Sequence, residues 1–218
     1  MYFYLDTAKV DQWEHWLTKG LFYGVTTNPI LLEQAQVPCS LAQLQQLATQ
    51  AFQLGAQEIH LQTWGTEVAE LVARGQAIAA IDQRAVVKVP ITLAGTEAAT
   101  QLLTQGIRVT LTGVYAIHQV LIAAAIKANF AAPYLGRITA LGENGPQQLA
   151  TMQQILDRTH SSTKLLVASI RNIEEMTYLA TQGLDTFTLS PSIADELFAV
   201  EVTQKAALAF EDAANRMR

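Results

Sequence analysis

The sequence is poor in charge. Asp, Glu, Lys and Arg together make up 15% of its 218 residues, well below the roughly 25% that is typical of globular domains. Basic residues are the minority, with 14 Lys and Arg against 19 Asp and Glu, and they form no basic run. This balance argues against nucleic acid or an anionic membrane as a partner. A surface with so little charge suggests that other copies of the chain cover part of it, so we expect a homo-oligomer.

The sequence also lacks the patterns of several other classes of protein. A single cysteine, Cys39, excludes an internal disulfide, and the four histidines (His15, His60, His118 and His160) show no HxxxH or HxH spacing, so we expect no metal site. No run of about 18 apolar residues predicts a membrane-spanning helix. The first residues, MYFYLDTAKV, have neither the basic nor the long apolar region of a signal peptide. We therefore expect a cytoplasmic protein without a membrane partner.

Short apolar runs alternate with longer segments of helical spacing. The expected strands are residues 2–6, 22–27, 58–63, 85–90, 107–112, 130–135, 164–169 and 185–190, and the expected helices include 41–57, 67–81, 115–128 and 172–183. Strands that alternate with helices predict a parallel sheet, and eight repeats in about 200 residues predict an α/β fold of the closed (β/α)8 TIM-barrel type.

We expect one domain over residues 1–218. An open doubly wound sheet is the alternative, but LDTAKV lacks the glycine-rich loop that often follows the first strand of that fold. Residues 199–218 come after the eighth unit and predict an additional C-terminal helix.

Polar side chains stand at the ends of nearly all these apolar strands. They are Asp6, Thr26, Thr27, Asn28, Gln62, Lys88, Thr110, Thr112, Tyr134, Arg137, Ser169, Arg171 and Ser190. Because barrels of this type build their active sites at the C-terminal ends of the strands, we expect a ring around one pocket. Strand ends that merely meet water would explain Thr and Ser, but they explain a carboxylate, a lysine and two arginines less well.

Lys88 lies in the middle of the apolar run AVVKVPIT. Strand alternation places Val86, Lys88 and Pro90 on one face, and in a barrel one face is the interior. Burial would disfavour the charged ammonium and lower its pKa, leaving a free amine that can form a Schiff base with a carbonyl. The alternative is a purely structural ion pair with a carboxylate such as Asp6.

Two further predictions concern groups near this lysine. Arg137, Arg171 and Ser169 offer two guanidinium forks and a hydroxyl, which suit a phosphate, although two arginines in exposed loops are the alternative. His60 lies two residues before Gln62 on the same strand, one layer below the expected pocket. We interpret it as a core histidine with local hydrogen bonds.

The motifs resemble those of the small transaldolase/fructose-6-phosphate aldolase family over essentially the whole chain. The matching stretches, in order, are YLDT (4–7), GVTTNP (24–29), VVKVPIT (86–92), APYLGRI (132–138) and VASIRN (167–172). The resemblance implies a (β/α)8 barrel, a lysine Schiff base with a ketose, and neither metal nor cofactor.

The resemblance also implies roles for single residues. Lys88 would be the Schiff-base lysine, and Asp6 the carboxylate that helps proton transfer and holds a substrate hydroxyl. Thr26 and Asn28 would contact the dihydroxyacetone part of the substrate, and Asn28 would orient Lys88.

On the same basis, Thr112 and Ser169 would bind further hydroxyl groups or, for Ser169, phosphate. Arg137 and Arg171 would hold the phosphate of a sugar-phosphate substrate. The C-terminal helix would lie at a subunit interface in a ring-shaped pentamer or decamer.

The family has two activities: transaldolases pass the three-carbon unit to an acceptor aldehyde, and aldolases release it as dihydroxyacetone. Transaldolases usually have Glu where this chain has Gln62, and Phe where it has Tyr134. Both positions therefore favour the aldolase, and a water held by the Tyr134 phenol could protonate the enamine. Arg171 is the more transaldolase-like residue. Trp64 is a departure near the expected pocket rim, and its effect has no prediction.

We therefore expect a class I aldolase that reversibly cleaves fructose 6-phosphate to dihydroxyacetone and glyceraldehyde 3-phosphate. The alternative enzyme is a transaldolase. A catalytically silent sugar-phosphate-binding barrel is the rival from another class, although a pure binder would not need Lys88, Asp6 and Tyr134 together.

Overall fold

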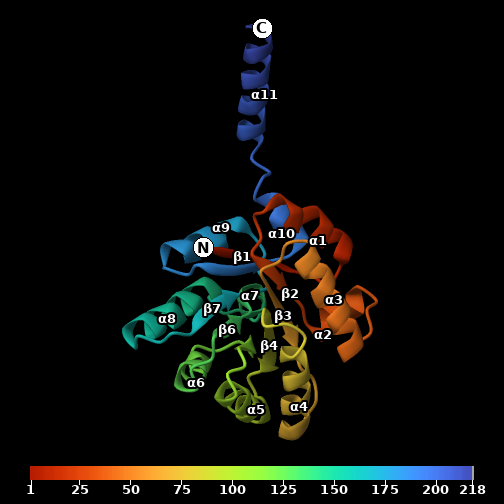
Figure 1. Ribbon diagram of the computed structural model, residues 1–218. Coiled ribbons are helices and arrows are strands. Elements are labelled where there is room, and N and C mark those ends of the chain that lie inside the picture. The colour runs from red at the N-terminus through yellow and green to blue at the C-terminus, as the bar shows by residue number, and fades with distance from the viewer. Residues whose placement is uncertain (218) are drawn as a thin grey trace.

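The computed structural model describes residues 1–217 and contains a closed barrel of eight parallel strands (Figure 1). Each strand pairs with the next one in the sequence, and the last pairs with the first. The strands are β1 Tyr2–Asp6, β2 Gly24–Thr26, β3 Glu58–Gln62, β4 Ala85–Pro90, β5 Val109–Val114, β6 Phe130–Pro133, β7 Lys164–Val167 and β8 Thr186–Leu189. The predicted (β/α)8 barrel is thus confirmed.

The helices lie outside the barrel (Figure 1). They are α1 Val10–Trp16, the 3-10 helix η1 Leu17–Lys19, α2 Pro29–Gln34, α3 Leu41–Gln53, α4 Val68–Ala79, α5 Leu93–Thr104, α6 Gln119–Ala125, α7 Leu135–Ala140, α8 Gly145–Arg158, α9 Ile173–Thr181, α10 Pro191–Glu196 and α11 Glu201–Arg216. The segments after β2 and β6 each hold two α-helices where the sequence pattern had suggested one.

Two predicted boundaries move for local reasons. The strand expected over 107–112 is observed at Val109–Val114, so it begins and ends two residues later, and it passes through a register shift at Gly113, whose φ of 76° belongs to the left-handed region. The helix expected from residue 115 begins only at Gln119. The Oε1 atom of Gln119 accepts hydrogen bonds from the backbone N–H groups of Tyr115 and Ala116, which holds these residues in a turn before the helix.

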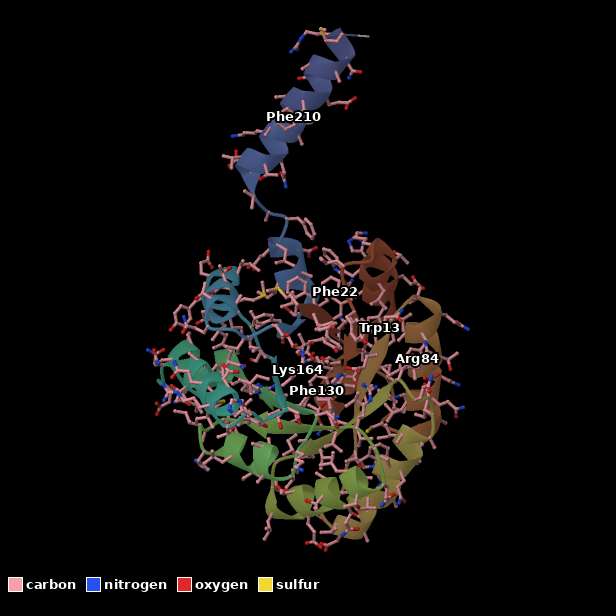
Figure 2. The ribbon with its side chains drawn as sticks, turned by 60° about the vertical axis from the view of Figure 1, so that its left-hand side comes forward. Trp13, Phe22, Arg84, Phe130, Lys164 and Phe210 are labelled. Carbon is pink, nitrogen blue, oxygen red and sulfur yellow. The ribbon has the colours of Figure 1, made fainter. Side chains whose placement is uncertain are left out.

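The predicted C-terminal helix is present as α11, and it stands away from the barrel (Figure 1). None of its described residues is buried, and its apolar side chains Val202, Leu208 and Phe210 are all more than two-thirds exposed. Figure 2 shows Phe210 far from the side chains of the barrel. The helix therefore contributes no packing to the core of its own subunit.

The barrel interior is unusually polar around Lys88. Val87 and Val89 belong to the apolar cluster of the main core, whereas Lys88 alternates with them and is 3% exposed. Its register partners are Gln62 on β3 and Thr110 on β5. Its ammonium donates to the backbone carbonyl of Thr27 at 2.9 Å, which confirms the inward direction expected from strand alternation.

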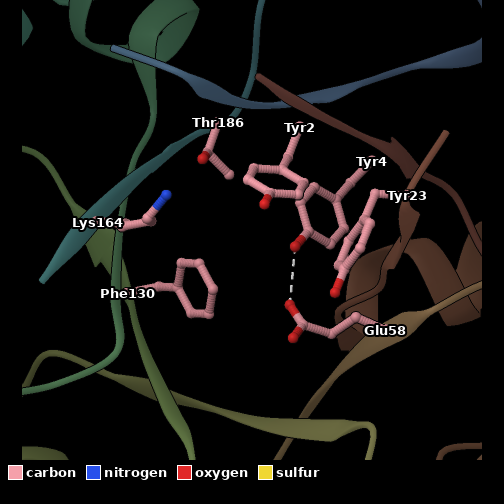
Figure 3. A pocket seen from close by; sticks show the side chains of 7 residues that line it. All are labelled: Tyr2, Tyr4, Tyr23, Glu58, Phe130, Lys164 and Thr186. Carbon is pink, nitrogen blue, oxygen red and sulfur yellow. Dashed lines mark hydrogen bonds between the residues drawn. The ribbon is translucent and has the colours of Figure 1, made fainter. Parts of the chain in front are cut away.

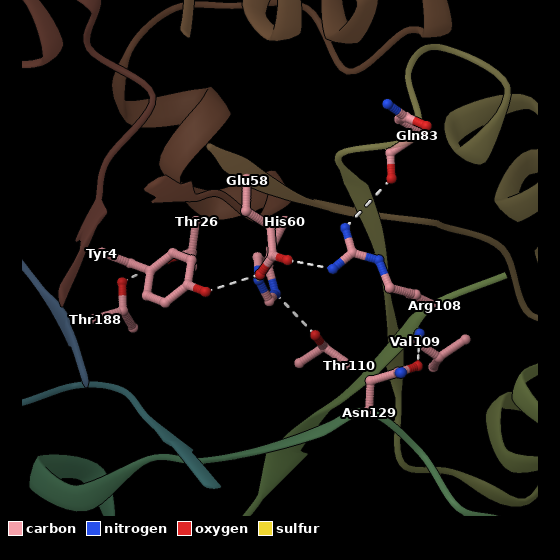
Figure 4. Close-up of polar contacts among 10 residues, drawn as sticks. All are labelled: Tyr4, Thr26, Glu58, His60, Gln83, Arg108, Val109, Thr110, Asn129 and Thr188. Atoms are coloured by element: carbon pink, nitrogen blue, oxygen red, sulfur yellow. Dashed lines mark hydrogen bonds and ion pairs between the residues drawn. The ribbon is translucent and has the colours of Figure 1, made fainter. Parts of the chain in front are cut away.

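A hydrogen-bonded network fills the interior nearer the N-terminal ends of the strands (Figure 4). Tyr4 Oη donates to Glu58 Oε1 (2.8 Å), and His60 Nε2 lies 2.7 Å from the same oxygen. The other ring nitrogen, Nδ1, lies 2.8 Å from Thr110 Oγ1, and Arg108 pairs with Glu58 Oε2. His60 is thus the buried core histidine that the sequence analysis expected.

The ionisation of this network follows from its contacts. Burial would raise the pKa of Glu58, but hydrogen bonds from His60 and Tyr4 and the charge of Arg108 outweigh it and hold that pKa at about 2. Burial lowers the pKa of His60, and this effect exceeds the opposing pull of Glu58. The pKa values of Glu58 and His60 are thus both lowered, so Glu58 is a carboxylate and His60 is a neutral imidazole. The two directions agree because Arg108, and not a protonated His60, supplies the positive charge beside the carboxylate. Neutral His60 then donates from Nε2 and accepts from Thr110 at Nδ1.

We expect the protein to lose stability in acid because of these two groups. In the unfolded chain His60 takes up a proton below about pH 6.5, which the folded chain resists, so stability falls below that pH. The Glu58 contribution, about 3 kcal/mol, is present above its ordinary pKa of 4.5 and is lost towards pH 2. Urea denaturation between pH 7 and pH 3 would measure both.

Glu58→Gln tests the carboxylate part of this prediction. Its stability should be lower at pH 7 and should change less between pH 5 and pH 3 than that of the unaltered protein. Glu14→Gln, on an exposed position of α1, should keep the original pH dependence. An unchanged slope in Glu58→Gln would contradict the assignment.

Candidate active site

Each end of the barrel has a hollow. Figure 3 shows the one at the N-terminal ends of the strands, about 160 Å³ in volume and lined by Tyr2, Tyr4, Tyr23, Glu58, Phe130, Lys164 and Thr186. Two charged groups that line it already have partners within the fold. Glu58 belongs to the interior network, and Lys164 forms an ion pair with Asp185 at 3.1 Å. Catalytic groups of these barrels lie at the other end, where Lys88 and Asp6 are found.

At the C-terminal end, two adjoining hollows share Asp6, Asn28, Arg137 and Ser169. The inner one, about 30 Å³, is lined by Asp6, Asn28, Lys88, Tyr134, Arg137, Ala168 and Ser169. The outer one, about 220 Å³, is lined by Asp6, Asn28, Ile30, Leu31, Gln34, Arg137, Ser169, Ile170, Arg171, Thr188 and Ser190. Eight of the polar strand-end residues that were predicted to ring one pocket therefore line these two adjoining hollows.

The Lys88 amine is the reactive group at the inner end of this site. Burial lowers its pKa from the ordinary 10.5, and the nearby Asp6 carboxylate only partly offsets that effect. Lowering the pKa raises the fraction of free amine near neutral pH. The lone pair of a free amine is the nucleophile that a Schiff base requires.

Asp6 is held by a chain of hydroxyl groups. Thr26 Oγ1 donates to Asp6 Oδ1 at 2.7 Å, and Thr188 Oγ1 lies 2.7 Å from Thr26 Oγ1 (Figure 4 shows this second contact). Because the single proton of Thr26 goes to the carboxylate, Thr188 donates in turn to Thr26. Burial raises the pKa of Asp6, against the charge of Lys88 and the Thr26 hydrogen bond. A carboxyl with a raised pKa is suited to accept and return a proton.

Tyr134 brings a phenol to the same inner hollow. Its hydroxyl lies 2.8 Å from Thr112 Oγ1, so Thr112 reaches the site through Tyr134. Burial raises the pKa of Tyr134, with Asp6 adding to the effect, and the phenol therefore keeps its proton at neutral pH. It can thus serve as a proton donor beside Lys88.

Three residues that the sequence analysis placed in or near the pocket, Asn28, Gln62 and Trp64, have contacts other than those expected or lie outside both hollows. Asn28 lines the site, but its Oδ1 caps α2 by accepting from Leu31 N–H at 3.0 Å, and the Lys88 ammonium donates to the Thr27 carbonyl instead. Gln62 pairs with Lys88 in register and lines neither hollow. Trp64 also lines neither, and it packs against the core, with the Arg74 guanidinium 5.3 Å from its ring centroid.

Of the expected phosphate residues, Arg137 lies in the first turn of α7, and Ser169 and Arg171 lie on the loop after β7. Backbone hydrogen bonds join these two segments. Gly136 N–H donates to the Ser169 carbonyl at 2.8 Å, and Leu135 N–H donates to the Ala168 carbonyl at 2.9 Å. A Cβ at Gly136 would lie 2.5 Å from that Ser169 carbonyl oxygen and from Arg171 Cγ, so only glycine permits this approach.

Ser169 has unusual backbone and side-chain properties. Its φ of 59° is left-handed, which is uncommon outside glycine. Within residues 1–217 its buried Oγ has no hydrogen-bond partner. A buried hydroxyl that lines a cleft beside two arginines is suited to bind an anion.

Sequence reasoning missed several residues around the site. Thr188 and Gln34 line the outer hollow, and Tyr115 contacts Arg137 and Tyr134 from outside it. The strand-end rule could have found Thr188, which lies on β8 two residues before Ser190. Tyr115 and Gln34 lie on the loop after β5 and on α2, where no strand-end pattern applies.

The part of the chain that the structure describes has neither a cluster of potential metal ligands nor a membrane-spanning helix. Among residues 1–217, no three His, Cys, Asp or Glu side chains gather as potential metal ligands. In the same range, every helix is too short or too polar to cross a membrane.

Comparison of sequences shows which known proteins this chain resembles. The family model described as Transaldolase/Fructose-6-phosphate aldolase matches residues 3–218. Proteins named "Probable transaldolase" from Rhodospirillum centenum and Lactiplantibacillus plantarum are 31% and 29% identical, covering 94% and 96% of this chain and 87% and 94% of their own. One from Desulfotalea psychrophila is 28% identical over 94% of both chains.

Comparison of structures supports the fold. A thiamine phosphate pyrophosphorylase from Pyrococcus furiosus superimposes with a TM-score of 0.59 over 87% of this chain and 85% of its own. At 11% identity, this likeness concerns the fold alone. The sequence match over nearly the whole chain is stronger evidence: the protein belongs to the transaldolase/fructose-6-phosphate aldolase family.

Proposed function

We propose that the protein makes and breaks the C3–C4 bond of a ketose, which joins the carbons α and β to the carbonyl, through a Schiff base on Lys88. The observation that carries this proposal is the buried Lys88 amine in a hollow that it shares with Asp6 and Tyr134. The amine attacks the ketose carbonyl, and loss of water gives an iminium ion. Asp6 takes the proton of the C4 hydroxyl, the C3–C4 bond breaks, and the electron pair moves to the iminium to form an enamine.

The phosphate end of the substrate would lie in the outer hollow. Arg137, Arg171 and Ser169 supply two cations and a free hydroxyl there, and sugar phosphates are therefore the substrate class. Thr26 would act by holding Asp6, and Thr112 by holding Tyr134. Asn28 would present its free amide N–H groups to the dihydroxyacetone part. Gln62, beside Lys88 on β3, remains a proposed site residue without a contact to assign its role.

For the fate of the enamine, transfer to an acceptor aldehyde is the better supported reaction. The relatives at 28–31% identity are named "Probable transaldolase". The family resemblance adds that Arg171 is the more transaldolase-like residue. Gln62 and Tyr134 had favoured the aldolase, whereas the names of the relatives favour the alternative, a transaldolase. The three-carbon unit would pass from fructose 6-phosphate to an aldose phosphate such as erythrose 4-phosphate.

A second candidate is release of the unit as dihydroxyacetone, which is the fructose-6-phosphate aldolase reaction. The observation that favours it is the Tyr134 phenol, which lines the inner hollow and keeps its proton. A donor at this place could protonate the enamine carbon and allow hydrolysis.

One assay separates the two reactions. Glyceraldehyde 3-phosphate formation from fructose 6-phosphate is measured first without, and then with, erythrose 4-phosphate. A transaldolase should give steady product only with the acceptor, and an aldolase should give it without. No product under either condition would contradict both.

We also propose that α11 packs on a neighbouring subunit in a homo-oligomer. Its exposed apolar side chains and its distance from the barrel support this (Figures 1 and 2). Deletion of residues 200–218 should leave a folded barrel with a lower mass by light scattering, because none of the described residues in that segment is buried. A truncated protein that kept the full assembly mass would refute this role.

A further inference from the structure

We propose that Tyr115 is a positioning residue that holds Arg137 for a substrate phosphate, and thereby sets the preference of the site for phosphorylated sugars. The inference rests on the proposed function, because it assumes that Arg137 meets that phosphate. Tyr115 lines neither hollow of the candidate site, and it acts through two residues that do.

The side chain of Gln119 fixes the backbone of Tyr115 by hydrogen bonds. It follows directly after β5, and its N–H donates to Gln119 Oε1 at 2.7 Å. The same oxygen accepts from Ala116 N–H at 3.0 Å. One side chain at the start of α6 thus holds two successive backbone groups, so the Tyr115 ring projects from a constrained turn.

The side chain of Tyr115 contacts both Arg137 and Tyr134. Its hydroxyl accepts a hydrogen bond from Arg137 Nη1 at 3.3 Å. Its ring meets the Tyr134 ring edge-on, with centroids 5.4 Å apart and planes at 72°. The Arg137 guanidinium lies 4.9 Å from the centroid of the Tyr134 ring. The three side chains therefore form one cluster, in which Tyr134 and Tyr115 together orient the guanidinium.

This orientation is needed because Arg137 is exposed. An exposed arginine samples many rotamers, and fixing it on substrate binding costs up to about 2 kcal/mol of side-chain entropy. Tyr115 takes one of its five N–H donors and leaves the others for an anion. Holding the fork in place before binding reduces the entropy lost at each binding event. That gain applies only to substrates whose phosphate reaches Arg137.

Tyr115→Phe tests the inference because it removes the hydroxyl and keeps the ring against Tyr134. With fructose 6-phosphate as saturating donor, kcat/KM is measured for erythrose 4-phosphate and for erythrose. The ratio of the two values should fall about 5- to 10-fold, mainly through a higher KM for the phosphorylated acceptor. The value for erythrose should change less than about twofold. Tyr2→Phe, at the opposite end of the barrel, should leave both values unchanged.

The Tyr115→Phe substitution in an Arg137→Lys background tests whether Tyr115 acts through the Arg137 guanidinium. If Tyr115 acts through Arg137, Tyr115→Phe should change the ratio less than about twofold there, because the guanidinium that Tyr115 orients is already absent. An equal loss for both acceptors, an unchanged ratio, or full additivity with Arg137→Lys would overturn the inference. Borohydride trapping of fructose 6-phosphate on Lys88 in the unaltered protein separates this outcome from failure of the proposed function: trapping would persist in the first case and be absent in the second.

Discussion

Replacing Lys88 by Met should abolish both transfer and release, with turnover reduced roughly 10⁴-fold or more. Methionine keeps an unbranched side chain in the buried space but has no amine to attack a carbonyl. Treatment with borohydride in the presence of fructose 6-phosphate should add the reduced sugar fragment to the unaltered protein. The Lys88→Met protein should keep its native mass, which mass spectrometry would measure directly.

Two controls accompany this prediction: substitution of a different lysine, and phosphate binding by the Lys88→Met protein. Lys164→Met removes an ammonium at the opposite end of the barrel and should leave the adduct and the turnover intact. Inorganic phosphate should still protect the Lys88→Met protein against thermal unfolding, because Arg137, Arg171 and Ser169 remain. Turnover in Lys88→Met similar to that of the unaltered protein would exclude the Schiff-base mechanism.

Replacing Tyr134 by Phe should lower any acceptor-free release of dihydroxyacetone about 100-fold, which is typical of the loss of a general acid. Transfer to erythrose 4-phosphate should fall less than about fivefold, because an acceptor aldehyde, rather than a proton, then captures the enamine carbon. The phenylalanine ring can keep the contacts of Tyr134 with Tyr115 and Arg137. Both rates come from one coupled assay, run with and without acceptor.

A graded variant adds weight to this second prediction. Thr112→Val removes the hydroxyl that lies 2.8 Å from the phenol, so it should lower release by less than Tyr134→Phe does. Equal losses of release and transfer in Tyr134→Phe would count against Tyr134 as the proton donor and would leave its role as packing beneath Arg137.

The sequence predicted the barrel well because its signals are local. Alternation within AVVKVP is a property of six neighbouring residues, and it correctly put Lys88 on the face opposite Val87 and Val89, which is the inner face of the barrel. The boundaries failed where a side chain or a backbone angle intervenes, as with the Gln119 carboxamide before α6 and the left-handed Gly113 in β5. Such details depend on contacts that no periodicity encodes.

In the candidate site, too, the residues with a local sequence pattern were predicted, and those that depend on contacts between distant residues were not. The strand-end rule and the family motifs together pointed to Asp6, Lys88 and Tyr134, which lie in one hollow. Tyr115 was out of reach, because its importance arises from two contacts with residues about 20 positions away in the sequence. Glu58 was missed as the centre of the interior network, since a glutamate at the start of a strand usually meets water.

The join at Gly136 has a consequence for how anions bind. Two backbone hydrogen bonds connect the first residues of α7, next to Arg137, to the loop before Arg171, so the separation of the two guanidinium attachment points is a property of the main chain. The conformational entropy of arranging these two segments is lost once, when the chain folds, and not again at each binding event. Phosphate binding should therefore leave the amide hydrogen-exchange rates of both segments almost unchanged, as expected for a rigid receptor rather than one that closes around its ligand.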